Sequence, residues 1–177
     1  MRLFKGLFLS FSFFWLIGML TASHAQSDIS FKIDGDNFTG TIQEAVLITI
    51  GGENFLQIKA ARKDQLVFLY LKEKALNGEL PVTLLYRDHD HEKKLTPDAE
   101  IVWAPEGGEQ PPWNAIEGEA VITQYDAVSR IISGTFEFVV EKQDFSTKKD
   151  RKKEQHDIED GKIDRIQFVV DASAAKK

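Results

Sequence analysis

Hydrophobic and polar residues alternate along much of the chain, most clearly between Gly118 and Glu141. In the second half of this stretch, one set of alternate positions is apolar except for one glycine: Ile132, Gly134, Phe136, Phe138 and Val140. Successive side chains of a strand point to opposite faces of a sheet, so this pattern predicts two half-buried antiparallel strands joined by a polar turn. Gly134 falls on the inward face between larger residues, where a glycine indicates close packing or a bulge.

Short apolar segments of the same kind follow one another from Ser27 onwards, with turn signals roughly every 8–12 residues. Polar turns such as Asp34–Asn37, Gly51–Asn54 and Arg62–Asp64 separate these segments. Lys72–Leu80 contains an Asn-Gly pair and is expected to form one helical turn or a loop, and no segment has the period of a long helix. The pattern predicts one all-β domain, an antiparallel meander of about nine or ten strands that forms a barrel or a sandwich.

The first 25 residues have the composition of a secretory signal peptide. Arg2 and Lys5 precede the largely apolar segment Leu7–Leu20, and residues 23–25 supply the small side chains of a cleavage site. A retained membrane helix is the alternative, but this apolar segment reaches only about 21 Å as a helix, short of the ~30 Å hydrocarbon core. We therefore expect an exported protein, periplasmic or secreted, whose single domain spans residues 26–177 and keeps no stable membrane anchor.

Cysteine is absent from the chain, which excludes a disulfide framework and a lipid anchor attached to cysteine. Stability must come from a hydrophobic core, and a chain of this length can bury roughly two-thirds of its unfolded surface. Once Arg2 and Lys5 are removed, the 22 basic residues fall to 20 against 28 acidic ones, a net charge of −8 with histidine neutral. Such a surface repels polyanions, so nucleic acid is not expected as a partner.

Asp88–Glu92 is the one cluster of metal-ligand residue types in the sequence. In an extended segment His89 and His91 point to the same side, so the pair, together with Asp90 and a third ligand such as His156, could hold Zn²⁺ or Cu²⁺. The simpler interpretation is a solvated loop, because closed zinc sites need three or four well-placed ligands. The segment is therefore a candidate metal site with a structural alternative.

Catalytic motifs occur only in incomplete form. His91–Leu95 begins like the zinc-protease motif but has leucine where the second histidine is required. Ser146–Lys149 matches the spacing of an acyl-serine motif, yet it lies in a lysine-rich run, and the partner motifs of that enzyme class are missing. We expect a protein without catalytic residues and without a cofactor.

Four aromatic residues, Trp103, Trp113, Tyr86 and Tyr125, are candidates for the lining of a ligand mouth, because aromatic rings stack on flat ligands. Trp103 alternates with its neighbours in the pattern of a strand and is expected in the core. Trp113 lies in the proline-rich segment Pro105–Ala115, which predicts a long loop. Trp113 could therefore contact a ligand or plug the end of a barrel.

A highly charged excursion, 142–160, follows the central pair of strands. It could be a basic finger for an anionic partner, but lysine, arginine and acidic residues are mixed, with no apolar stripe beside them. Runs of mixed sign favour a solvated surface segment. The last residues, 172–177, are expected to form a frayed tail.

Three blocks of the sequence resemble a known family: Ile29–Gly40 (ISFKIDGDNFTG), the VITQYD and ISGTFEF motifs within Gly118–Glu141, and the final Ile158–Phe168 (IEDGKIDRIQF). The family comprises small exported bacterial proteins of unknown function, often lipid-anchored. The resemblance implies an all-β body of the calycin-like barrel or sandwich type and brings no catalytic residues. This chain differs in lacking the anchoring cysteine and in carrying the charged insertion at 142–157.

The function expected from these observations is non-catalytic binding of a small ligand or of a cell-envelope partner. One alternative is a structural envelope component without a small ligand, which would associate through its edge strands. Another is a metal-binding protein that uses Asp88–Glu92.

Overall fold

The computed structural model describes residues 27–87, 96–106, 111–142, 154–171 and 174. In these ranges the chain forms strands throughout, interrupted by one short helix. The elements are β1 (Asp28–Ile33), β2 (Asp36–Ile50), β3 (Glu53–Arg62), β4 (Gln65–Lys72), α1 (Glu73–Leu76), β5 (Val82–Arg87), β6 (Ala99–Ala104), β7 (Trp113–Asp126), β8 (Ile131–Lys142), β9 (Gln155–Gln167) and β10 (Val169–Val170).

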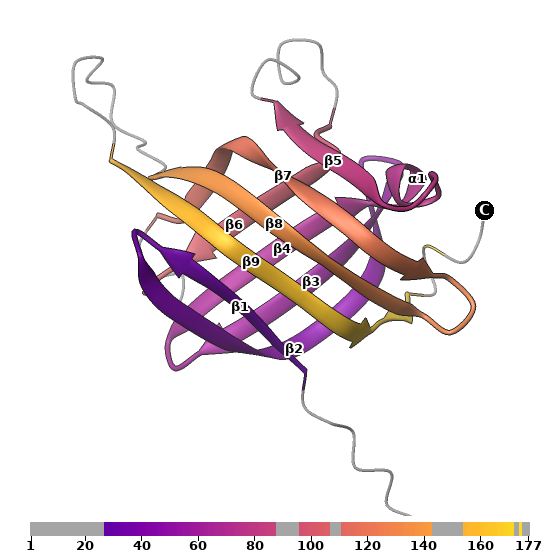
Figure 1. Ribbon diagram of the computed structural model, residues 1–177, viewed down its shortest axis with the longest axis horizontal. Helices are drawn as coiled ribbons and strands as arrows, with labels where there is room; N and C mark the ends of the chain where they lie inside the picture. The colour runs from indigo at the N-terminus through magenta and orange to yellow at the C-terminus, as the bar shows by residue number, and fades with distance from the viewer. Residues whose placement is uncertain (1–26, 88–95, 107–110, 143–153, 172–173, 175–177) are drawn as a thin grey trace, which may run out of the picture.

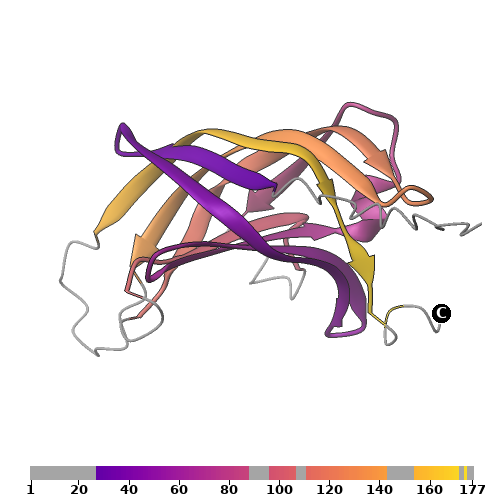
Figure 2. The same ribbon diagram turned by 90° about the horizontal axis from the view of Figure 1, so that it is seen from below.

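Eight of the strands form a closed antiparallel barrel in the order β1–β9–β8–β7–β6–β4–β3–β2, and β2 returns to β1 to complete the circuit (Figure 1). β5 pairs with β7 outside this circuit, and β10 runs parallel to β2. Seen from below, the orange and yellow strands β7 to β9 arch over the purple strands β2 and β3 (Figure 2). The predicted all-β fold is confirmed, and of the two predicted architectures the structure is the barrel, consistent with a calycin-like body.

The alternation that predicted β8 matches its burial. All five positions on the predicted inward face are buried, namely Ile132, Gly134, Phe136, Phe138 and Val140. Side chains from the other strands meet them in one hydrophobic cluster, which includes Leu56, Ile58, Leu69 and Ile101, each with no exposed surface. An eight-stranded barrel is just wide enough for its own side chains to fill it, so this cluster forms the barrel core.

Gly134 allows β7 and β8 to approach closely. A Cβ atom at this position would lie 2.4 Å from the main-chain oxygen of Val121 and 3.0 Å from Cδ1 of Ile122. The register of β8 shifts against β9 between Ile132 and Gly134, so the glycine also sits at a bulge. The prediction of a close-packed or bulged glycine is confirmed. Nearby, the large ring of Phe136 has room because Gly161 of β9, which has no side chain, lies directly opposite it.

Two expectations about segment boundaries were wrong. The proline-rich segment expected to be a loop up to Ala115 already enters β7 at Trp113, because Trp113 pairs with both Lys142 and Trp103. Gln155–Asp160, at the end of the expected charged excursion, belongs to β9, where most of its polar residues are exposed while Ile158 is buried. The intervening residues 143–153 lie outside the described ranges.

The C-terminal segment closes the barrel at the end of β9. The main-chain N–H of Phe168 donates to the oxygen of Arg130 at 2.9 Å, and that of Asp171 donates to the oxygen of Leu47 at 3.1 Å. Phe168 is buried, and so is Ala174, at 7% exposure. β10 therefore covers part of the edge of β2 that β1 leaves unpaired.

Candidate functional site

Two of the four aromatic candidates, Trp103 and Trp113, meet at one end of the barrel. Their ring centres are 5.8 Å apart, and the ring of His156 lies 4.2 Å from Trp113 and 5.7 Å from Trp103. Trp113 is only 6% exposed, and the amine of Lys142 lies 5.8 Å from its ring centre. Of the two roles predicted for Trp113, this packing favours the plug at the barrel end.

Trp103 is half-buried and packs against the core, which agrees with its expected place in a strand. Its indole Nε1 is buried and has no hydrogen-bond partner among the described residues. An unpaired buried donor costs about 1–3 kcal/mol, so this nitrogen is an energetically unfavourable point in the aromatic cluster.

Tyr86 and Tyr125 lie apart from the two tryptophans. Tyr125 stacks on Phe168 with ring centres 5.8 Å apart, and burial, followed by the nearby charge of Glu73, raises the pKa of its hydroxyl. Tyr86 is 6% exposed and lies on β5, beside Gly118 of β7. The structure thus brings Trp103 and Trp113 together but places the two tyrosines at separate positions.

The candidate metal ligands His89, Asp90 and His91 lie outside the described residues. His156, the suggested third ligand, instead contacts the carboxylate of Asp34 through its Nδ1 atom. Across the described ranges, no group of three or more histidine, aspartate or glutamate residues is arranged to hold a metal ion.

An open cleft of about 700 Å³ lies on the outer wall of the barrel, where β5, β7, β8 and β9 run side by side. Its acidic lining comes from three of these strands: Glu117, Glu119, Glu137, Asp157 and Glu159. Apolar side chains such as Leu85, Ile116 and Val139 lie between the carboxylates. The cleft therefore combines apolar surface with a strong local excess of negative charge.

Strand register brings the carboxylates of the cleft together. Glu119 on β7 lies directly opposite Glu137 on β8, and Asp157 on β9 lies opposite Val139. Directly opposite side chains in antiparallel strands have Cβ atoms about 4.5–5.5 Å apart, and like charges at that distance destabilise the pair. No described side chain forms an ion pair or a hydrogen bond with Glu119 or Glu137.

Of the aromatic residues predicted to contact a ligand, Tyr86 lines this cleft. Sequence reasoning missed the carboxylates of the cleft, because they occupy the ordinary polar face of the alternation. Glu117 and Glu119 are separated by Gly118, whose φ of 141° and close contact with Phe138 suit only glycine. In the sequence the only available signal was the repetition of glutamate on the outward face of predicted neighbouring strands, since the register of those strands could not be read.

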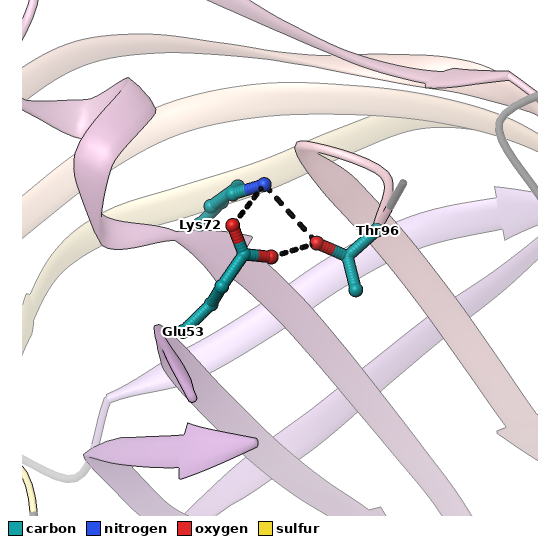
Figure 3. A network of polar contacts seen from close by, with 3 residues as sticks. All are labelled: Glu53, Lys72 and Thr96. Carbon is teal, nitrogen blue, oxygen red and sulfur yellow. Dashed lines mark hydrogen bonds and ion pairs between the residues drawn. The ribbon is translucent and has the colours of Figure 1, made fainter. Parts of the chain in front are cut away.

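A separate polar network joins Glu53, Lys72 and Thr96 at the end of the barrel opposite Trp103 and Trp113 (Figure 3). Lys72 at the end of β4 forms an ion pair of 2.9 Å with Glu53 and donates a hydrogen bond of 3.1 Å to the hydroxyl of Thr96, which in turn donates to Glu53. The hydrogen bond from Thr96, and then that from Lys72, lower the pKa of Glu53. These contacts attach the residues before β6 to β3 and β4.

Comparisons with protein-family models, with curated proteins and with solved structures found no match to this chain. In the described ranges, no helix has the length and hydrophobicity needed to cross a membrane. The cleft and the aromatic cluster are therefore interpreted from their own geometry.

Proposed function

We propose that this protein is an exported, non-catalytic binding protein that holds a positively charged ligand in the acidic cleft. The observation that carries the proposal is the open cleft of about 700 Å³, which has the size of a small-molecule site and has carboxylates on three strands. The ligand is either a small organic cation or a basic group of a cell-envelope partner. Both carry a positive charge, which the carboxylates of the cleft attract.

The packed barrel core supports a site on the outer wall. Calycin-like barrels with an open interior can enclose a ligand, but here side chains such as Phe136 and Ile101 meet in the interior and are almost fully buried. The open cleft on the outward face of β7, β8 and β9 offers a ligand a site outside this packed core.

The charges of the cleft determine which ligands can bind. A cation placed between Glu119 and Glu137 relieves the repulsion between two carboxylates that face each other across neighbouring strands. Each exposed charge pair contributes about 0.2–1 kcal/mol, so the carboxylates together contribute at most about 5 kcal/mol, which corresponds to a dissociation constant of about 0.1–1 mM. The interaction must weaken in salt, because the Debye length is about 8 Å at physiological ionic strength.

Isothermal titration calorimetry with spermidine and with a short lysine-rich peptide tests the proposal. We expect binding that weakens as salt is raised and that falls at least fivefold in the double variant Glu119→Gln/Glu137→Gln. The double variant Glu44→Gln/Glu79→Gln is the control, because it removes the same charge from exposed positions outside the cleft.

The two probes distinguish the two sources of the positive charge. Binding of spermidine indicates a small ligand, and binding of the peptide alone indicates an envelope partner. Equal losses in both double variants would show a general effect of net charge, and no heat with either probe would refute the cleft as the site. N-terminal sequencing of the protein produced in bacteria tests export separately, with residue 26 as the expected start.

A further inference from the structure

The residues that line the acidic cleft lie in three rows that run across the strands β5, β7, β8 and β9 (Figure 1). The members of the middle row lie directly opposite one another on these strands and are Tyr86, Gly118, Phe138 and Ile158. Gly118 has no side chain, and the other three residues are buried in the barrel core. The middle row therefore presents main chain to the cleft and forms its floor.

The two outer rows form the walls of the cleft, and all five of their carboxylate residues are exposed. One wall consists of Glu119, Glu137 and Glu159, and the other of Glu117, Val139 and Asp157. Asp160, the next residue after Glu159 along β9, forms an ion pair of 2.7 Å with Lys32 of β1. The two walls are two residues apart along each strand, which is about 6.8 Å, so a ligand between them has negative charge on both sides.

The carboxylates of the first wall are spaced regularly, because each belongs to a different strand. Neighbouring strands lie about 4.8 Å apart, so the three positions from β7 to β9 span about 9.6 Å. An extended saturated chain advances about 1.2 Å per bond, which places two amines joined by three methylene groups about 5 Å apart and the two ends of spermidine about 11 Å apart. The charges of a linear polyamine therefore recur at nearly the same interval as those of the wall.

We propose that the cleft binds a linear polyamine, which lies across β7, β8 and β9 between the two acidic walls. This inference rests on the proposed function, because it names the class of cation that the same cleft holds. The amines meet the carboxylates of the walls, and the methylene groups between them lie over the floor.

Methylene groups suit this floor better than the main chain of a basic peptide does. The strands of the floor are already paired on both edges, β7 with β5 and β8, and β8 with β7 and β9. Peptide N–H and C=O groups placed on them would find no main-chain partners there, whereas a polyamine has no polar group between its amines. Val139, the apolar member of the second wall, offers these methylene groups a contact between Glu117 and Asp157.

Calorimetric titration with spermidine and with hexaamminecobalt(III) tests the shape of the ligand separately from its charge. Both probes carry three positive charges at neutral pH, but the cobalt complex is compact and has no methylene groups. We expect spermidine to bind about fivefold more tightly or better, because apolar contact adds to the attraction between charges. Equal affinities, or tighter binding of the cobalt complex, would overturn the polyamine and leave the cleft as a general cation site. If neither probe binds, the proposed function fails as well.

Three variants test the placement of the ligand. Glu159→Gln removes the last charge of the first wall and should weaken spermidine binding by about twofold or more. Asp164→Asn is the matched control, because it removes one charge from an exposed position of β9 outside the cleft, and it should leave the affinity unchanged. Val139→Thr keeps the branched shape but adds a hydroxyl group, so it should weaken the binding of spermidine and not that of hexaamminecobalt(III).

The same titrations contain the results that would contradict this placement. Equal losses in Glu159→Gln and Asp164→Asn would show that spermidine does not reach β9 through the cleft. An equal effect of Val139→Thr on both probes, or no effect on either, would show that no methylene group contacts the second wall. Circular dichroism of each variant confirms that the barrel is folded before its affinity is compared.

Discussion

Replacement of Gly134 with alanine tests the closest approach between strands in the barrel. The added Cβ atom would lie 2.4 Å from the main-chain oxygen of Val121 and 3.1 Å from Cα of Ile122. Both are main-chain atoms of β7. This strand pairs with β8 along one edge and with β5 along the other, so neither atom can shift without disturbing the sheet.

The expected loss follows from this geometry. Overpacking by one methyl group in a tight core costs about 1–3 kcal/mol, and a contact with main chain rather than with a flexible side chain places Gly134→Ala near the middle, at about 2 kcal/mol. For a domain of this size that loss lowers the melting temperature by about 4–8 °C. Gly134→Leu should be worse, because its extra atoms point into the filled barrel core.

Chemical denaturation followed by circular dichroism measures the effect, with Gly78→Ala as the matched control. A Cβ atom on Gly78 would meet its nearest atoms, Ala75 O and Val82 Cγ2, at 3.5 Å, an ordinary contact distance. The control should therefore change the free energy of unfolding by no more than about 1 kcal/mol in either direction. If Gly134→Ala is as stable as Gly78→Ala, the close-packed placement of Gly134 is wrong.

Two further predictions concern the ends of the barrel. Trp113→Ala should lower the free energy of unfolding by about 3–5 kcal/mol, because it empties a buried aromatic cluster; a loss below about 1 kcal/mol in urea denaturation would contradict the plug. Thr96→Val removes the main cause of the lowered pKa of Glu53, and this contribution is present above the ordinary glutamate pKa and is lost as pH falls through the folded value. The difference in free energy of unfolding between wild type and Thr96→Val should therefore be at most about 1 kcal/mol at pH 7 and should shrink in acid. A difference that grows in acid would show that Thr96 does not stabilise the carboxylate form of Glu53.

The carboxylates of the acidic cleft and the contact between Asp34 and His156 show why tertiary information was needed to find them. Asp34 and His156 are 122 residues apart in the sequence, and only the pairing of β1 with β9 brings them into contact. Glu119 and Glu137 look like ordinary solvent-facing residues until the register of β7 and β8 places them opposite each other. Neither pair can be recognised from neighbouring residues in the sequence, because its two members belong to different strands.

The sequence by itself determined the class of fold. A period of two is a local property of the chain, and it predicted the strands, the buried face of β8 and the tight position of Gly134, all of which the barrel contains. Sequence could not decide between barrel and sandwich, because the pairing of β1 with β9, which closes the barrel, depends on the relative placement of distant segments. The burial of Trp113 depends on the tertiary structure in the same way, since it results from contact with Trp103 and His156, which belong to two other strands.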